Sequence, residues 1–487
     1  MSPPAFAYDD VPYEDFPVTE SHVDTLYVEA RRAGLDAVPP RRARILELGC
    51  AHAVNLIPMA FDLPQAQCLG IDLSPKQIER GRAHVQSLGL SNLELRCADV
   101  MELELGARRF DYVIAHGLYS WVPEPVRARV LTLCRDHLAE GGVAYLSYNA
   151  MPAWGIRGAI ARALLQGVGA VEDVFEKVRR ARAVLARLEQ VQPLRGTAEG
   201  ALMKIEIDAL RDVPDSYLLH EYLVPCSRAF YLCEVVERAQ QAGLRWIGDV
   251  APGSLSPAER RRTRAALEGL ADDPLVAEQL TDIVGFRQFR ASLLCRADAS
   301  LATPPSWSEL LADSFVAAPP ADPSPGDSAE VRVVLDALGQ RWPRDLPLDV
   351  LAEGLGGEVA SVVDTLGSLI ADGRVRLRPR SLPIVTEPGE QPGVSALARF
   401  ESQHRSFVTT PLHEHSPLDV FHSALVALLD GLHTRAALVE ALADDIEAGR
   451  LKLTSEHVPT RAQLSAALVG MVERGLNGLA LTGMLTA

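Results

Sequence analysis

The stretch that most constrains the fold is residues 44–56, RILELGCAHAVNL. A short apolar run carries an acid, Glu47, and ends at Gly49, and a second apolar run begins at Val54. This order is typical of a buried parallel strand that turns sharply into a helix. Small residues at such a turn let a ligand lie against the backbone, and the helix N-terminus beyond it offers unpaired N–H groups. Taken alone, the turn also fits a strand–helix junction without a ligand.

Three further strands are predicted downstream, and acids stand at the ends of two of them. The predicted strands are residues 66–71, 93–98 and 110–115, with helices at 54–61, 75–88 and 101–105. Asp72 ends the first of them and is placed to accept hydrogen bonds from ribose hydroxyls. Asp99 ends the second, and His116 follows the third. The alternation predicts an α/β fold with a Rossmann-like doubly wound sheet, whose ligand crevice lies at the carboxyl ends of the strands.

Two classes of cofactor compete for this crevice. A dinucleotide needs the turn Gly-x-Gly-x-x-Gly, which lets a pyrophosphate reach the helix N-terminus. This turn has a single glycine, Gly49, and Ala51 and Ala53 stand at the later positions. S-adenosylmethionine needs no room for a pyrophosphate, and its amino group suits the acids at the three strand ends. We therefore favour S-adenosylmethionine as the cofactor.

Four motifs resemble those of class I S-adenosylmethionine-dependent methyltransferases: residues 47–50 (ELGC), 70–74 (GIDLS), 98–100 (ADV) and 110–113 (FDYV). A closer resemblance is to the bacterial branch with a methyltransferase regulatory domain, which includes rickettsial-type protein lysine methyltransferases. The segments that carry this closer resemblance are residues 8–13, 55–60, 116–123, 147–154, 220–223 and 286–290. The resemblance covers most of the chain.

The resemblance implies a set of cofactor-binding residues: Glu47, Gly49, Cys50, Ala51, Asn55, Asp72, Leu73, Asp99, Val100 and His116. A fifth strand is predicted at residues 143–148. Residues after the fourth strand and at the end of the fifth should meet at the same crevice, and the catalytic candidates among them are His116, Tyr119, Tyr148 and Asn149. Trp121 and Trp154 are expected to pack beside them. The family usually has Gly near position 53, and Ala53 is tolerable there if its φ stays negative. No residue is predicted to bind a metal.

Composition and periodicity divide the chain into six parts. These are an N-terminal arm and helix (1–40), a methyltransferase domain (41–195), a helical regulatory domain (196–310), a linker (311–328), a winged-helix-like module (329–385) and a C-terminal helical domain (386–487). Residues 359–372 of the module hold no Lys or Arg, which favours protein contacts over DNA. His413-Glu414-His415 lacks the His-Glu-x-x-His spacing of a zinc site and is predicted to be a surface loop.

Residues 1–30 hold acids and aromatic side chains but no Lys or Arg. One interpretation is an acidic, partly ordered arm. The other, implied by the resemblance, is a lid that places Tyr13 and Phe16 near the adenosyl group or the acceptor. An acidic, aromatic entrance would favour a cationic acceptor such as a lysine ammonium. Further along, His220-Glu221 is expected to form a packing hydrogen bond between domains.

A net charge of −16 argues against nucleic-acid partners and against anionic membranes. Seven scattered cysteines without Cys-x-x-Cys spacing suit reduced thiols in a bacterial, cytoplasmic protein. The leading hypothesis is methylation of an amine, with a protein lysine side chain as the favoured acceptor. The alternatives are N- or O-methylation of a small metabolite or natural product, and a catalytically inert cofactor-binding adaptor. Protein contacts are expected through the C-terminal domains, and a homodimer is left open.

Overall fold

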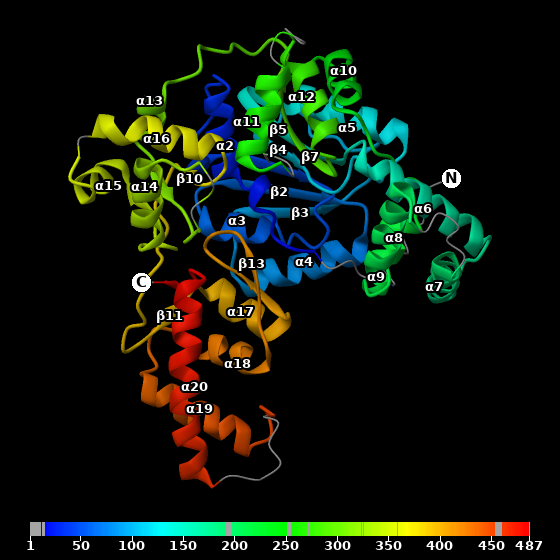
Figure 1. Ribbon diagram of the computed structural model, residues 1–487. Helices are drawn as coiled ribbons and strands as arrows, with labels where there is room; N and C mark the ends of the chain where they lie inside the picture. Colours follow the sequence, from blue (N-terminus) through cyan, green and yellow to red (C-terminus); the bar gives the residue numbers. More distant parts are fainter. Residues whose placement is uncertain are drawn as a thin grey trace.

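The computed structural model describes residues 11, 15–190, 196–250, 255–267, 269, 273–322, 324, 326–357, 359–452 and 460–486. Within these ranges, none of the helices combines the length and the apolar character needed to span a bilayer. Figure 1 shows a central sheet with helices packed around it and a C-terminal helical part that extends away from it.

A seven-stranded sheet in the order β3-β2-β1-β4-β5-β7-β6 forms the centre of the molecule (Figure 1). Its strands are β1 (Arg44–Leu48), β2 (Gln67–Asp72), β3 (Leu93–Cys97), β4 (Phe110–Ala115), β5 (Leu138–Asn149), β6 (Leu244–Asp249) and β7 (Phe289–Arg296). Strands β1 to β5 pair in parallel, whereas β7 runs antiparallel to both β5 and β6. The predicted Rossmann-like α/β fold is confirmed, with a mixed rather than a wholly parallel sheet.

The last two strands come from the region that the sequence pattern assigns to a helical regulatory domain. Strands β6 and β7 enter the sheet only after the long excursion of residues 150–243. Arg290 of β7 is fully buried, and its Nε lies 2.7 Å from Oδ2 of Asp282 in α12 (Pro274–Val284). The same guanidinium pairs with Asp249 of β6. A buried cation needs such partners, so these ion pairs hold α12 against β6 and β7 at the sheet edge.

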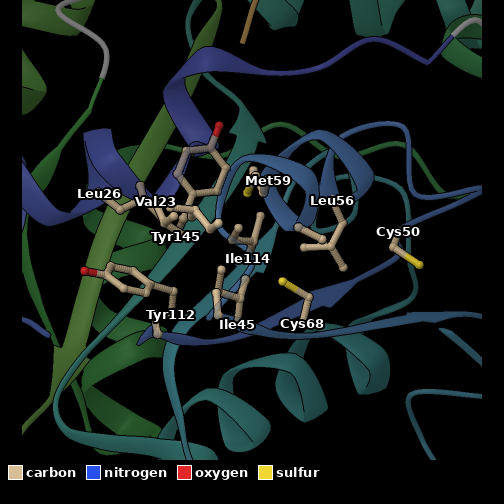
Figure 2. Close-up of a cluster of buried hydrophobic side chains, with 14 of the residues drawn as sticks. Val23, Leu26, Ile45, Cys50, Leu56, Met59, Cys68, Tyr112, Ile114 and Tyr145 are labelled. Atoms are coloured by element: carbon tan, nitrogen blue, oxygen red, sulfur yellow. The ribbon is translucent and has the colours of Figure 1, made fainter. Parts of the chain in front are cut away.

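Two apolar cores lie on opposite faces of the sheet, because side chains alternate along a strand. One core is covered by α2 (Val23–Arg32), α3 (Leu56–Asp62) and α4 (Pro75–Ser87), and its strand residues include Ile45, Tyr112, Ile114 and Tyr145 (Figure 2). The other is covered by α5 (Glu124–His137) and α10 (Leu232–Gln241), and its strand residues include Leu46, Val113, Leu146 and Tyr148. Residues 101–105, predicted as a short helix, form turns and extended chain instead.

The helices between β5 and α10 build a core of their own beside the sheet (Figure 1). They are α6 (Ala153–Val168), α7 (Val174–Gln190), α8 (Ala198–Ala209), α9 (Asp215–Tyr217) and the π-helix η3 (Leu218–Tyr222). Trp154 of α6 packs edge-on against Trp121, with 5.8 Å between ring centroids. The two indoles therefore pack together, as expected.

Two further regions complete the chain. The first contains α13 (Trp307–Leu311), α14 (Ala329–Gly339), α15 (Leu348–Gly354) and α16 (Val359–Ala371) around the sheet β10-β8-β9, formed by β8 (Phe315–Ala317), β9 (Leu346–Pro347) and β10 (Arg376–Arg378). The second contains α17 (Ala396–His404), α18 (Val420–Leu428), α19 (Arg435–Glu447) and α20 (Arg461–Leu481), with the strand pairs β11 (Gly393–Val394) and β14 (Leu485–Thr486), and β12 (Phe407–Thr409) and β13 (His415–Pro417). Helix α11 (Pro257–Leu267) lies beside α12. The predicted domain limits stay predictions.

Candidate active site

The turn after β1 has an uncommon backbone. Gly49, Ala51 and Ala53 all adopt positive φ values, of 74°, 46° and 62°. The N–H groups of Gly49 and Cys50 donate to the carbonyl of Ile71 in β2, at 2.8 and 3.0 Å, and so fix the turn to the neighbouring strand. The expectation that φ of Ala53 stays negative is therefore wrong. Burial of its side chain and these strand contacts hold a conformation that costs an L-residue about 1–2 kcal/mol.

Replacing Ala51 by Gly should raise the free energy of unfolding by about 1 kcal/mol, because Gly adopts positive φ without the Cβ clash. Ala53→Gly is the matched control. Its fully buried methyl group contributes about 0.8 kcal/mol of packing, so its gain should be smaller. Urea unfolding followed by far-UV circular dichroism measures both. An Ala51→Gly variant less stable than the wild type would contradict the strain assigned to this turn.

Asp72, at the end of β2, organises the same turn. Its Oδ2 accepts a hydrogen bond from the Ala51 N–H at 2.8 Å, and its Oδ1 accepts one from the Ser74 N–H at 2.9 Å. Burial raises the pKa of Asp72, while the backbone N–H groups of Ser74 and Ala51 oppose that shift. Each carboxylate oxygen has a further lone pair, which could accept a hydrogen bond from a ribose hydroxyl.

Glu47 of β1 is 3% exposed, and only one of its two carboxylate oxygens has a hydrogen-bond partner among the described residues. Its Oε1 accepts a hydrogen bond from Asn55 Nδ2 at 2.8 Å, whereas its buried Oε2 has no hydrogen-bond partner among the described residues. Burial raises the pKa of Glu47 to about 8, and the charges of Asp15 and Asp72 add to this shift. A buried acceptor without a donor costs free energy. The Oε2 atom therefore suits a ligand that brings N–H donors and a positive charge, such as an ammonium group.

The other predicted cofactor residues offer different surfaces. Cys50 is buried, so it brings only its backbone to the turn. Leu73 and Met101, which follow β2 and β3, are 42% and 43% exposed and present apolar surface that suits an adenine ring. Val100 is half-buried, and Asp99 is exposed, with its Oδ1 accepting a hydrogen bond from the Met101 N–H at 2.8 Å.

His116 follows β4 and contacts the fifth strand. Its Nδ1 lies 3.0 Å from the hydroxyl oxygen of Tyr145, and its ring lies 5.9 Å from the rings of Tyr145 and Phe289. Burial lowers the pKa of His116 to about 4, against the opposing charge of Asp15. The imidazole is therefore neutral at physiological pH.

Two of the four catalytic candidates, Tyr119 and Tyr148, are core residues, so the prediction that all four converge at the crevice is wrong. Tyr119 and Tyr148 lie in the core under α5 and α10, with ring centroids 6.4 Å apart, and the Tyr148 hydroxyl is 3.0 Å from Ser292 Oγ. Asn149 points to the opposite face from Tyr148, because neighbours in a strand alternate. Its Nδ2 is buried and makes no hydrogen bond with the described residues. His116 and Asn149 thus remain as candidates, and we propose no catalytic role for the two tyrosines.

Asp15 is a member of the site that sequence reasoning missed. Its Oδ2 lies 3.2 Å from Nδ1 of the buried His52 in the turn. Its charge also contributes to the pKa shifts of Glu47, Asp72 and His116. The N-terminal arm therefore brings a third carboxylate to the ends of β1, β2 and β4. Its sequence holds many acids, and nothing in it marks this one.

The rest of the arm also packs against distant segments. Phe16 lies 4.6 Å from the ring of His415 and 5.3 Å from the ring of Phe407, so it contacts the C-terminal region. His220 Nε2 lies 2.6 Å from the Val11 carbonyl oxygen, which is the kind of packing hydrogen bond predicted for it. Tyr13 lies outside the described residues.

His413 is not on the surface, so the prediction of a surface loop is wrong for this residue. It is 3% exposed, and its Nε2 lies 2.9 Å from Asn55 Oδ1. Packing against Asn55 and Thr19, far away in the sequence, buries it, and the local sequence carries no sign of that packing.

The sheet order, the strained turn after β1 and the acids at the ends of β1 and β2 define the class I methyltransferase fold. S-adenosylmethionine fits this arrangement. Glu47 Oε2 could receive its ammonium group, Asp72 its ribose hydroxyls, and the apolar surface of Leu73 its adenine.

Comparisons with known proteins agree with this class. Residues 45–142 match the family described as "Methyltransferase domain", residues 214–296 the "Predicted methyltransferase regulatory domain", and residues 390–484 the "PKMT, C-terminal winged helix domain". The winged-helix match thus lies C-terminal to the module predicted at 329–385. The chain thus carries a methyltransferase domain followed by a methyltransferase regulatory domain, the combination that its sequence motifs resemble.

Individual relatives show how far the likeness extends. An uncharacterized protein of Rickettsia prowazekii is 31% identical over 299 residues, which cover 60% of this chain and 53% of that protein. A second uncharacterized protein of the same organism is 29% identical over 235 residues, covering 48% of this chain and 94% of that protein. The matched stretch thus spans about half the length of the first relative. The structure of PKMT2 from Rickettsia typhi in complex with AdoHcy has the same fold, with a TM-score of 0.83 at 23% identity over 98% of this chain and 100% of that one.

Proposed function

We propose that this methyltransferase transfers the methyl group to an amine nitrogen, and that the amine is a lysine side chain of a protein acceptor. The observation that carries the proposal is the position of Asp15, whose charge reaches Glu47, Asp72 and the neutral His116. Because Glu47 and Asp72 are assigned to the cofactor, Asp15 is the carboxylate that remains to attract a cationic acceptor from solution. The family matches named for PKMT and the shared fold with PKMT2 support a protein acceptor.

The chain's task in this reaction is chiefly alignment. When bound, S-adenosylmethionine would supply an electrophilic methyl group on a sulfonium centre. The acceptor nitrogen would take this group as its bond to sulfur breaks, with S-adenosylhomocysteine as the leaving group. Alignment of two reactants can contribute ~7–11 kcal/mol. A general base gives ~10²–10⁴-fold, which is about 3–5 kcal/mol. Positioning is therefore the larger contribution, and a single change at His116 should cost less activity than the loss of cofactor binding.

We assign some of the predicted residues to the cofactor and the others to the methyl acceptor. Glu47 and Asp72 bind and orient the cofactor, whereas His116 and Asn149 position the acceptor. The acceptor amine must be neutral when it attacks, so its proton leaves to water beforehand. Because His116 is uncharged, it adds no positive charge beside the amine. The buried Asn149 Nδ2 can donate a hydrogen bond to a backbone or side-chain oxygen of the acceptor.

Methyl-labelled S-adenosylmethionine and a bacterial lysate test this proposal. We expect label in the acid-precipitated protein fraction, and methylated lysine after its hydrolysis. The Asp72→Ala variant, which should not bind the cofactor, is the control and should transfer no label. Label confined to small molecules would replace the proposal with methylation of a metabolite. A protein that binds S-adenosylhomocysteine but labels neither fraction would instead be an inert adaptor.

A further inference from the structure

A loop of the C-terminal region reaches the cofactor turn. Residues 410–414 join β12 to β13, and in Figure 1 β13 lies near α3. The His413 carbonyl oxygen accepts a hydrogen bond from Thr19 Oγ1 at 2.9 Å, and its ring lies 4.7 Å from that of His22. The φ of His413 is +58°, which L-residues adopt rarely. A bulky residue stays in this conformation only where its surroundings hold it.

The side-chain amide of Asn55 has no hydrogen-bonding capacity left for a ligand. Its Oδ1 accepts from the Val18 N–H at 3.0 Å and lies 2.9 Å from His413 Nε2. Its Nδ2 donates to Glu47 Oε1 at 2.8 Å and to Ser21 Oγ at 3.0 Å. An amide has two N–H donors and one oxygen with two lone pairs, so all four positions are used within the protein. Asn55 therefore links Glu47 to His413 and does not itself contact the cofactor through its amide.

The donor and the acceptor of the hydrogen bond between His413 and Asn55 can be assigned. The Val18 N–H identifies the oxygen of the Asn55 amide, and an amide oxygen only accepts. His413 Nε2 must therefore be the donor, which makes the ring the neutral Nε2–H tautomer. Its Nδ1 is buried and has no hydrogen-bond partner among the described residues, and a proton on that nitrogen would therefore have no acceptor. Burial lowers the pKa of His413 well below its usual value, in agreement with a neutral ring.

We propose that His413 is a positioning residue for cofactor binding. By holding Asn55, it fixes Oε1 of Glu47 and leaves Oε2 directed at the cofactor ammonium. The C-terminal region thereby becomes part of the cofactor site, although its loop lies far along the chain from the turn. This inference rests on the assignment of Glu47 to the cofactor in the proposed function. The contacts of Phe16 with Phe407 and His415 hold the two strands that flank this loop against the N-terminal arm.

Two substitutions at His413 separate positioning from stability. In His413→Gln the amide nitrogen reaches as far as the imidazole Nε2 and can still donate to Asn55, whereas in His413→Asn it reaches only as far as Nδ1. Asn, however, tolerates positive φ better than Gln does. We expect His413→Gln to bind S-adenosylhomocysteine within about 2-fold of the wild type. His413→Asn should bind it about 2- to 10-fold more weakly, as one lost neutral hydrogen bond predicts. Stability should follow the opposite order.

Isothermal titration calorimetry gives the affinities, and urea unfolding gives the stabilities. Glu414→Gln, one position further along the same loop, is the control and should bind like the wild type. In a Glu47→Gln background the difference between the two His413 variants should vanish, because the amide that replaces the carboxylate leaves no second oxygen to accept a hydrogen bond from the ligand ammonium. Affinities that follow stability, or a difference that persists without Glu47, would overturn the proposal. If Glu47→Gln alone binds like the wild type, the assignment of Glu47 to the cofactor ammonium is wrong. If Glu47→Gln binds weakly but His413→Asn binds like the wild type, only the positioning role of His413 is wrong.

Discussion

The Asp72→Ala variant is expected to bind S-adenosylhomocysteine at least 100-fold more weakly than the wild type. The substitution removes two charge-assisted hydrogen bonds, from the N–H groups of Ala51 and Ser74, that shape the turn. Each such bond contributes about 1.5–3 kcal/mol. It also removes the acceptors that we assign to the ribose hydroxyls. Isothermal titration calorimetry at pH 7.5 measures the affinity.

Asp99→Ala provides the matched comparison for Asp72→Ala. Asp99 ends the neighbouring strand, but it is exposed and holds only the Met101 N–H. Its loss should weaken binding by about 10-fold or less, because an exposed hydrogen bond contributes about 1 kcal/mol. Equal losses in the two variants, or binding by Asp72→Ala within 3-fold of the wild type, would show that the end of β2 is not the ribose site.

Glu47→Gln should weaken the binding of S-adenosylhomocysteine by about 10- to 150-fold, the cost of losing a hydrogen bond of about 1.5–3 kcal/mol to a charged group. The amide keeps an oxygen for Asn55 Nδ2, so the link to the C-terminal region can persist. Titration calorimetry compares the variant with Glu20→Gln, which changes an exposed acid of the arm and should bind like the wild type. Unchanged affinity in Glu47→Gln would contradict the ammonium site.

The same substitution, although it weakens binding, should make the protein more stable relative to the wild type as pH rises. The pKa of Glu47 is about 8 in the folded protein, above its ordinary value of 4.5. Folding therefore favours the protonated form, and the stability gained in this way is lost as pH rises from about 4.5 through 8. Gln carries no such proton, so the stability of Glu47→Gln relative to the wild type should increase between pH 6 and pH 9. We expect a relative gain on the order of 2 kcal/mol. Urea unfolding at both pH values measures it, and a constant difference would contradict the raised pKa.

The part of the site nearest to the turn could be predicted because its signals are local. Strand β1, Gly49 and the acid Asp72 follow from apolar runs, a small-residue turn and the position of one carboxylate. Strands β2 to β4 agree with their predicted ranges to within one residue. The entry of β6 and β7 into the sheet could not be predicted in this way, because their partners are separated from them by the helices of residues 150–243.

One error could have been avoided from the sequence. Tyr148 and Asn149 are consecutive in a strand, so their side chains must face opposite sides of the sheet and cannot share one site. The same alternation places Tyr145, not Tyr148, beside His116. The positive φ of Ala53 was also concealed, since an alanine gives no sign that its backbone is strained.

Other members of the site have no local signal. Asp15 is one acid among many in the arm, and only tertiary packing places it against His52. His413 stands in a polar loop that contacts Thr19 of the N-terminal arm and Asn55 of the methyltransferase domain. Contacts between segments this far apart in the sequence require knowledge of how the domains dock, which neither composition nor periodicity provides.

The number of protons released when S-adenosylhomocysteine binds at pH 7 tests the central claim most directly. With a pKa of about 8, Glu47 is mostly protonated in the free protein, and it must ionise to pair with the ligand ammonium. Calorimetric titrations in phosphate and in Tris, whose ionisation enthalpies differ, give the proton count. We predict a release close to one proton for the wild type and close to none for Glu47→Gln. Binding by the wild type without proton release would contradict the role of Glu47 as the acceptor of the cofactor ammonium.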